Sequence, residues 1–203
     1  MKVVITIPAY NEEKDIGRVI EEIRKVMDSR EYTYRVIVVD DGSMDNTVRI
    51  AEENKAIVFL NKRNLGLAET FRKEMKESLK LKPEVIVHTD ADGQYPSSYI
   101  PDMIKKVQEG YDLVLGARFD KGSYSGSITK RLGNIAFAKV FSNLLKTKLT
   151  DTTTGFRAFT PEVAQLPIIN NFTYTQEQLI RAGKAKMKIT EIQVDNGVVF
   201  LQA

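Results

Sequence analysis

Three clusters of oxygen-bearing side chains stand out in this chain, and each follows an apolar run typical of a strand. They cover residues 8–12, 40–43 and 90–94, and the last contains Asp90 and Asp92 separated by a single alanine. Two carboxylates this close raise each other's pKa unless a cation lies beside them. Carboxylate and amide oxygens are hard ligands that suit Mg²⁺ or Mn²⁺. Each cluster therefore indicates either an ordinary turn or helix cap, or part of a site for a divalent cation.

The elements that must position these clusters alternate along the first half of the chain. Buried strands are predicted at residues 2–10, 34–43, 56–61, 84–90 and 111–118. Amphipathic helices are predicted between them, at residues 11–29, 44–55, 64–81 and 97–110. This alternation predicts an α/β domain with a mostly parallel central sheet and helices on both faces. Ligands bind beyond the carboxyl ends of the strands in such sheets, so the three clusters are expected to meet at one edge.

The alternation ends after Arg118. We predict a loop at residues 119–127, a long amphipathic helix at 128–149, a polar turn at 150–155, a strand at 156–160, a helix at 174–184 and a closing strand at 187–194. The default interpretation of the long helix is packing against the core. The alternative is that its Phe137 and Phe141 face, flanked by lysines, rests on an anionic membrane.

Composition excludes several classes of function. The chain has 203 residues, no cysteine and a formal net charge of +3, with lysine and glutamate interspersed. It therefore offers no thiolate metal site and no basic stripe for nucleic acid. No apolar run approaches the roughly 18 residues of a membrane-spanning helix, and the first residues do not form a signal peptide. These features predict a cytoplasmic protein of one domain, in which the single histidine, His88, is a core residue.

Seven short segments, taken together, resemble glycosyltransferase family 2. They occur in the order IPAYNE, VVDDGSMDNT, NLGLAET, DADGQYP, GAR, KRLGN and DTTTGFRAF. Within the family they are most similar to the dolichol-phosphate (polyprenol-phosphate) mannose or glucose synthases. The resemblance implies a single GT-A (Rossmann-like) domain over residues 1–203, with a nucleotide-sugar-binding half at 1–118 and an acceptor-side half at 119–203. It also implies a GDP- or UDP-sugar donor, Mg²⁺ or Mn²⁺, inversion at the anomeric carbon and a polyprenyl phosphate acceptor at a membrane face.

The resemblance also implies roles for particular residues. Those expected around the nucleobase and ribose are Pro8, Tyr10, Glu12, Val39 and Asp41. Those expected at the ribose, diphosphate and metal are Asp90, Ala91, Asp92 and Gln94, with Asp92 and Gln94 as the metal ligands. Phosphate binding is expected from Arg118 and Arg131, and these two arginines with Asp92 are the expected catalytic residues.

Three further positions carry weaker expectations. Asp40 fits better as a packing and turn-forming residue than as a ligand for the base. Gly66 either lets the backbone lie close to the nucleotide or simply begins a helix. Asp151 and Arg157, in the segment DTTTGFRAF, are expected to organise the acceptor side.

The nature of the acceptor depends on whether a catalytic base is present. Transfer to a hydroxyl needs a carboxylate to take the proton, and relatives of that type carry a Glu-Asp pair where this chain has only Glu177 in YTQEQL. A phosphate acceptor is already anionic and needs arginines instead, which Arg118 and Arg131 supply. The sequence therefore favours a polyprenyl phosphate acceptor.

Two alternatives remain open on the sequence alone. One is transfer to a soluble or polysaccharide hydroxyl, with Glu177 as the base. The other is a non-catalytic nucleotide-sugar-binding domain, because the basic segment that follows the closing strand in the lipid-phosphate group has no counterpart here: no Arg or Lys follows Lys188.

Overall fold

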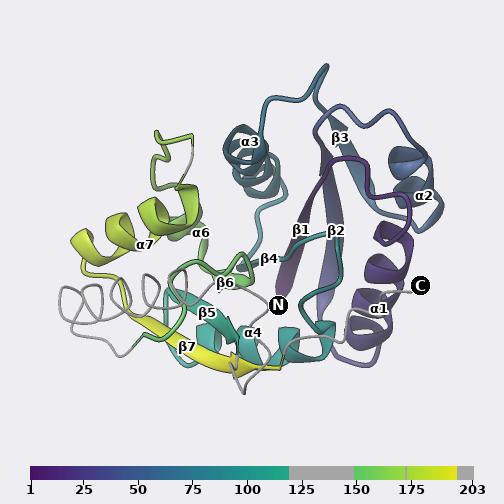
Figure 1. Ribbon diagram of the computed structural model, residues 1–203. Coiled ribbons are helices and arrows are strands. Elements are labelled where there is room, and N and C mark those ends of the chain that lie inside the picture. The colour runs from purple at the N-terminus through teal and green to yellow at the C-terminus, as the bar shows by residue number, and fades with distance from the viewer. Residues whose placement is uncertain (119–148, 172, 196–203) are drawn as a thin grey trace.

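The computed structural model describes residues 1–118, 149–171 and 173–195. Within these residues the chain forms one mostly parallel sheet with helices on both faces (Figure 1), as the alternation predicts. The loop expected at 119–127, all but the last residue of the helix expected at 128–149, and Arg131 lie outside the described residues. No helix in the described ranges is long and apolar enough to cross a bilayer.

The sheet of the described residues has seven strands in the order β3-β2-β1-β4-β6-β5-β7. The strands are β1 (Lys2–Ala9), β2 (Thr33–Asp40), β3 (Ile57–Leu60), β4 (Val85–His88), β5 (Leu113–Arg118), β6 (Arg157–Phe159) and β7 (Ile189–Val194). Only β6 runs antiparallel to its neighbours, β4 and β5. It therefore joins the two halves of the chain in one sheet, an arrangement that its sequence does not reveal.

The helices divide between the two faces of the sheet. They are α1 (Ile16–Asp28), α2 (Thr47–Glu53), α3 (Leu67–Lys80), the short 3₁₀ helix η1 (Ser97–Tyr99), α4 (Ile100–Gln108), α6 (Pro161–Ala164) and α7 (Tyr174–Lys184). One apolar core joins α1 and α4 to the sheet, and a second joins α3, α6 and α7 to the opposite face. Figure 1 shows α1 and α2 on one side of β1 and β2, with α3 on the other.

The strands are continuous apolar runs because both of their faces are covered. Ile5 and Ile7 of β1 belong to the core formed with α1, and neither is exposed. Thr6, between them, points to the α3 face and is equally buried. The parallel register pairs Ala9 with Asp40 and Thr6 with His88. The carboxyl ends of β1, β2 and β4 therefore lie at one edge, where the predicted clusters follow them.

Candidate functional site

A cavity of about 350 Å³ opens at this edge of the sheet, beyond the ends of β1, β2 and β4. The residues that line it are Pro8, Ala9, Tyr10, Glu12, Asp41, Asn64, Gly66, Leu67, Thr70, Asp90, Ala91 and Asp92. Parallel strands bring the loops that follow them to a common rim. The three polar clusters of the sequence thus contribute to a single hollow.

Four residues expected at the site have other placements or lie outside the described chain. The side chain of Val39 in β2 is fully buried, and Val39 does not line the cavity. Gln94 is exposed beyond the turn, and Arg118 lies at the end of β5; neither lines the cavity. Arg131 lies outside the described residues. The cavity therefore unites the residues expected from β1 and those at Asp41 and 90–92, but not the whole expected set.

Besides Ala9, which lies inside the predicted cluster at residues 8–12, sequence reasoning misses Asn64, Leu67 and Thr70 of the cavity wall. These last three lie between β3 and the first turn of α3. They belong to the segment NLGLAET, in which the sequence predicts only Gly66 near a ligand. Helix α3 begins at Leu67, and the Thr70 hydroxyl donates to the Gly66 carbonyl at 3.2 Å. The available signal is positional: a helix that follows a parallel strand presents its first turn to the same edge as the strand's carboxyl end.

The Asp41 carboxylate holds the loop that forms one wall of the cavity. Its Oδ1 accepts hydrogen bonds from the Asn61 amide at 2.8 Å and the Leu65 backbone N–H at 2.9 Å. Its Oδ2 accepts the Gly66 N–H at 2.8 Å. Gly66 has a φ of +89°, which an L residue rarely adopts. Asp41 therefore fixes the position of the loop, whatever further contact it makes with a ligand.

The neighbouring Asp40 is a turn former, in line with the expectation from the sequence. Its Oδ2 accepts the backbone N–H groups of Gly42 and Ser43, each at 3.0 Å. A side chain at Gly42 would lie 2.7 Å from the backbone of Arg63, and Gly42 has a φ of +79°. The Asp40 turn thus lets two loops approach each other at the rim.

Negative charge is concentrated on the side of the cavity formed by β1 and β4. Burial raises the pKa of Glu12, and the carboxylates of Asp92, Asp15 and others nearby raise it further. Burial also raises the pKa of Asp90; the Asp92 carboxylate adds to this effect. Because the acids oppose one another's ionisation, a cation bound among them would lower the free energy of the folded protein.

The donor set at this rim fits a hard divalent cation that is shared with a ligand. The described residues contain no group of three or more His, Cys, Asp or Glu side chains able to hold a metal ion by themselves. Asp92 lines the cavity, and one of its oxygens accepts the Gln94 backbone N–H at 2.9 Å. Mg²⁺ typically binds one or two carboxylates and completes its shell with water and phosphate oxygens. The residues present match that mode of binding.

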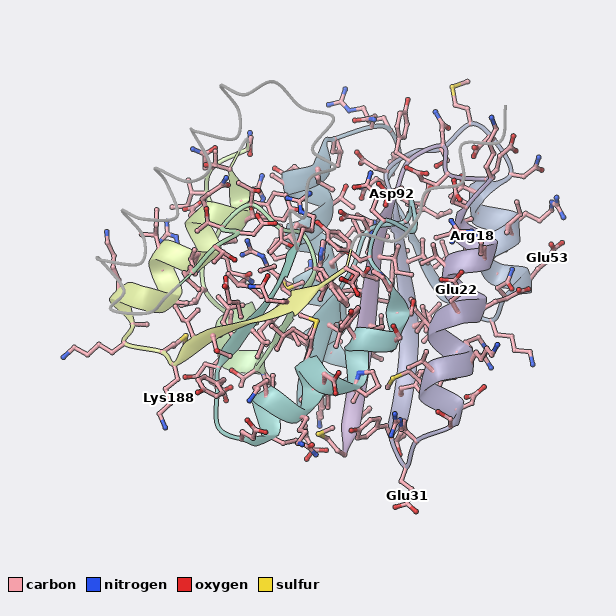
Figure 2. The ribbon with its side chains drawn as sticks, turned by 60° about the horizontal axis from the view of Figure 1, so that its bottom comes forward. Arg18, Glu22, Glu31, Glu53, Asp92 and Lys188 are labelled. Atoms are coloured by element: carbon pink, nitrogen blue, oxygen red, sulfur yellow. The ribbon has the colours of Figure 1, made fainter. Side chains whose placement is uncertain are left out.

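The turn that carries Asp92 is packed against α1. Gly93 has a φ of +73°, and a Cβ at this position would lie 2.5 Å from the Arg18 guanidinium. Arg18 is itself held by Asp15 at 2.6 Å and Glu22 at 3.2 Å. Figure 2 shows Arg18 and Glu22 along α1, near the turn that carries Asp92. Only glycine satisfies both the backbone angle and the close approach of the arginine.

Arg118 faces the segment that follows the undescribed part of the chain. Its guanidinium donates to Asp151 at 2.8 Å and Thr153 at 3.2 Å, and lies 6.0 Å from the Tyr95 ring centre. Burial alone would raise the pKa of Asp151, but hydrogen bonding to Arg118 and Thr153 holds it below its usual value. The pair thus fixes an arginine at the end of β5, one-third exposed, near Tyr95 in the segment that follows Asp92.

Arg157 is buried beneath the same segment and is 1% exposed. Its guanidinium donates to the carbonyls of Thr152, Thr154 and Thr175 and to the Gln178 side chain, at 2.7 to 3.2 Å. Burial lowers its pKa to about 10. Arg157 therefore braces residues 152–154 against α7 from inside the protein, instead of presenting charge to a ligand.

Glu177, the candidate base for a hydroxyl acceptor, has other partners. Its Oε2 accepts the backbone N–H groups of Ile169 at 3.0 Å and Asn170 at 2.7 Å, and its Oε1 accepts two hydrogen bonds from Arg181. Burial opposes ionisation, but these donors hold the pKa of Glu177 below its usual value. Glu177 does not line the cavity. Its carboxylate is thus a structural group that ties a loop to α7.

His88 is a core residue, as the sequence predicts. It has no exposed surface and packs edge-on against Phe71, with ring centres 5.2 Å apart. Its Nε2 lies 3.3 Å from the equally buried Glu74 carboxylate of α3. An apolar strand therefore ends in a buried ionisable pair directly below the cavity residue Asp90.

The amino-acid sequence of the chain is similar to those of known glycosyltransferases. A family model described as glycosyl transferase family 2 matches residues 4–165. The chain is 34% identical over 194 residues to the dolichyl-phosphate hexose transferase of Haloferax volcanii, covering 94% of this chain and 80% of that protein. It is 29% identical over 214 residues to the dolichol-phosphate mannosyltransferase of Pyrococcus furiosus, covering 98% of this chain and 57% of that one.

A solved structure supports the same fold. The glucosyl-3-phosphoglycerate synthase of Mycobacterium tuberculosis, in complex with Mn²⁺, uridine diphosphate and phosphoglyceric acid, superposes with a TM-score of 0.75. The match covers 96% of this chain and 69% of that one, at 20% identity. At this identity the likeness establishes the fold alone.

Proposed function

The chain belongs to glycosyl transferase family 2, and from this premise we propose that it moves a hexose, mannose or glucose, from a nucleoside-diphosphate sugar to a polyprenyl phosphate. The observation that carries the proposal is a cavity lined by carboxylates that follow β1, β2 and β4. A metal–diphosphate group is the ligand whose charge distribution suits such a rim. The named relatives that act on dolichyl phosphate support the acceptor.

We assign the donor's nucleoside, from a GDP- or UDP-sugar, to the part of the cavity formed by Pro8, Tyr10 and Glu12. Tyr10 is 44% exposed there and offers a ring face to the base. Asp41 contributes through the loop that it holds and through contact with the base. Val39 acts from within β2 by keeping this edge rigid. Asp90 and Ala91 face the ribose and diphosphate.

Asp92, with Gln94 beside it, is the proposed ligand pair for Mg²⁺ or Mn²⁺. The bound ion would stabilise the negative charge of the departing nucleoside diphosphate as a Lewis acid. The glucosyl-3-phosphoglycerate synthase structure, which has the same fold and holds Mn²⁺ and uridine diphosphate, supports a divalent cation as the cofactor. The protein contributes a fixed turn, because Gly93 packs on Arg18 and Asp92 accepts the Gln94 N–H.

The proposed acceptor phosphate needs positive charge more than it needs a base. A phosphate oxygen attacks the anomeric carbon and forms the new C–O bond, while the bond to the diphosphate breaks and the nucleoside diphosphate leaves with the electron pair. Attack from the face opposite the leaving group inverts the configuration. We propose Arg118, which Asp151 holds at the end of β5, and Arg131 as the two residues that bind the acceptor phosphate.

Transfer to a hydroxyl acceptor is less well supported. That reaction needs a carboxylate free to take a proton, and both oxygens of Glu177 are already engaged with Ile169, Asn170 and Arg181. A lipid acceptor also implies peripheral contact with the cytoplasmic face of a membrane, which we propose together with the acceptor. Residues 128–149, for which the sequence offers membrane contact as the alternative to core packing, lie almost wholly outside the described residues.

Donor and acceptor profiling tests the proposal. Purified protein is incubated with UDP-glucose, UDP-N-acetylglucosamine, GDP-mannose or GDP-glucose, with undecaprenyl phosphate or dolichyl phosphate in detergent, and with or without Mg²⁺ or Mn²⁺. We expect one donor to yield a polyprenyl phosphohexose only when metal is present. Transfer to free sugars or polysaccharide, with none to either lipid phosphate, would overturn the acceptor assignment.

A further inference from the structure

A set of fully buried polar groups lies beneath the floor of the cavity. His88 of β4, Glu74 of α3 and Thr6 of β1 each have no exposed surface. The Thr6 hydroxyl donates to Glu74 Oε1 at 2.5 Å, and His88 Nδ1 lies 2.7 Å from the Gly155 carbonyl oxygen. The set therefore links three elements to the segment that enters β6. None of these groups has a role in the proposed transfer reaction.

The geometry places a proton between the imidazole and the carboxylate. A carbonyl oxygen only accepts, so His88 Nδ1 must carry a hydrogen and donate it to Gly155. In the neutral ring Nε2 would then present a lone pair to Glu74 Oε2, 3.3 Å away. Neither atom has a hydrogen-bond partner elsewhere in the described residues. Two facing lone pairs on fully buried side chains are strongly unfavourable, whereas a proton on Nε2 makes the pair attractive.

Other ionisable groups around His88 come from α7, from β6 and from the end of its own strand. Tyr174 of α7 has its ring centre 6.3 Å from the imidazole, and Asp90 follows the same strand. Arg157, opposite His88 in β6, directs its guanidinium to carbonyls and Gln178. Burial disfavours the imidazolium, but the Glu74 carboxylate prevails and the pKa of His88 is raised. Glu74 is thus the partner that sets the charge of the ring.

Gly155 connects this buried pair to the cavity. A Cβ at Gly155 would lie 2.9 Å from Asp90 Oδ1 and 3.0 Å from Oδ2, so the Asp90 carboxylate rests on the bare glycine. The Gly155 N–H donates to the Tyr95 hydroxyl at 3.2 Å, while its carbonyl accepts from His88. These two partners lie on either side of the segment 90–94 in the chain. The Asp90 carboxylate has no hydrogen bond of its own among the described residues, and it packs against the backbone of Gly155.

We propose that His88 is a positioning residue. The proton that it shares with Glu74 keeps the Gly155 backbone in the position against which the Asp90 carboxylate packs. The affinity for the sugar donor therefore depends on that proton. The second part of this inference rests on the proposed function, because it concerns the donor. Loss of the proton leaves a buried carboxylate facing a lone pair. The repulsion moves the ring, weakens its hold on Gly155 and releases Asp90 from its position.

Two variants separate the proton from the packing. In Glu74→Gln, the amide oxygen accepts from Thr6 and the amide nitrogen donates to Nε2 of a neutral imidazole, so every hydrogen bond is retained without a titrating proton. In His88→Leu, the donor to Gly155 is lost and Glu74 is left buried without a cation. Glu74→Gln should preserve the packing of Asp90 on Gly155 at all pH values, and His88→Leu should lose this packing.

Nitrogen NMR of the protein labelled with ¹⁵N-histidine reads the proton directly, and His88 is the only histidine in the chain. We expect both ring nitrogens to be protonated at pH 7 in the wild type and to lose a proton only at alkaline pH. In Glu74→Gln we expect a neutral ring with hydrogen on Nδ1 at pH 7. A neutral wild-type ring at pH 7, or one with hydrogen only on Nε2, would overturn the inference.

Calorimetric titration with UDP-glucose and GDP-mannose, each with Mg²⁺, then tests the consequence. For the donor that binds, we expect wild-type affinity to fall about threefold or more across the pH at which His88 deprotonates, and Glu74→Gln to show no such fall. His88→Leu, folded by circular dichroism, should bind at least about fivefold more weakly. The same alkaline fall in Glu74→Gln, or normal affinity in a folded His88→Leu, contradicts the positioning role. If neither donor binds the wild type, the proposed function fails, while the NMR result still decides the shared proton.

Discussion

Asp40 and Asp41 are adjacent and both buried, yet their hydrogen-bond partners give them different tasks: one forms a turn and the other fixes a loop. Asp90 and Asp92 line the cavity together with Asp41, but the Asp90 carboxylate, unlike the other two, has no hydrogen bond among the described residues. The types of these residues and their place after strands could be predicted from the sequence. The pairing of Arg118 with Asp151 could not, since it joins residues 33 apart in the sequence and no local pattern predicts a contact at that separation.

Glu177 provides a prediction at this scale. Glu177→Gln keeps an oxygen for the loop N–H groups but removes the charge that faces Arg181. We expect kcat for the lipid-phosphate acceptor to stay within about twofold, and the free energy of unfolding to fall by about 1 kcal/mol. Steady-state kinetics and urea unfolding measure the two effects. A loss of transfer of roughly 100-fold, with folding and donor affinity intact, would show that Glu177 is a catalytic base and that the phosphate-acceptor mechanism is wrong.

The elements of the first half follow closely from the sequence, because apolar strands and amphipathic helices alternate with clear periodicity. In the second half, the spacing predicts a helix at residues 174–184, and α7 has those bounds. The antiparallel direction of β6 is not predictable, since three residues carry no directional signal and its neighbours β4 and β5 are distant in sequence. The four-residue helix α6 escapes prediction for a similar reason: it is too short for a periodic pattern.

The turn between β4 and η1 offers a test of how α1 supports the site. Gly93→Ala combines the strain of a φ of +73° with displacement of the Arg18 side chain. Gly110→Ala is the matched control, because Gly110 has a φ of +94° and a Cβ added there would meet nothing within 4 Å. We expect each to lose about 1 kcal/mol or more of stability from backbone strain, and Gly93→Ala alone to weaken metal-dependent donor binding.

The control makes this expectation specific. Urea unfolding compares the two alanine variants, and titration with donor and Mg²⁺ compares their affinities. Adding Arg18→Ala to Gly93→Ala removes the steric conflict and should recover part of the lost stability. If Gly93→Ala and Gly110→Ala bind the donor equally well, the packing of Arg18 on the turn has no role in holding Asp92.

At the scale of the whole molecule, β6 lies between β4 and β5 in one sheet. The sheet therefore carries both the acidic residues that line the cavity and Arg118, at the end of β5. The folded state keeps the pKa values of Glu12 and Asp90 raised. A raised pKa on an acid means that the folded state holds protons more firmly than the unfolded chain does. These two groups therefore favour folding at low pH, and their contribution is lost as the pH rises above about 4 through their folded pKa values.

A divalent cation should reverse this loss. Because the pKa values of Glu12 and Asp90 are raised, protons compete with Mg²⁺ for these carboxylate oxygens more strongly at pH 4.5 than at pH 7.5. We expect 10 mM Mg²⁺ to raise the melting temperature more at pH 7.5 than at pH 4.5, since binding to the folded state alone stabilises it. Differential scanning fluorimetry at both pH values, with NaCl at matched ionic strength as control, measures the effect. An equal shift at both values would indicate non-specific screening.

The most direct test concerns Asp92. Isothermal titration calorimetry of the donor selected by profiling is performed with Mg²⁺ and with EDTA, on the wild type, Asp92→Asn and Asp102→Asn, whose exposed carboxylate lies on α4. We predict that Mg²⁺ strengthens binding at least about tenfold in the wild type and in Asp102→Asn, and that Asp92→Asn abolishes this gain. Asp92→Asn should also reduce kcat/KM by roughly 100-fold or more, because a Lewis acid supplies several kcal/mol. Binding by Asp92→Asn that still responds to Mg²⁺ as the wild type does would contradict the proposed metal-binding role of Asp92 at this rim.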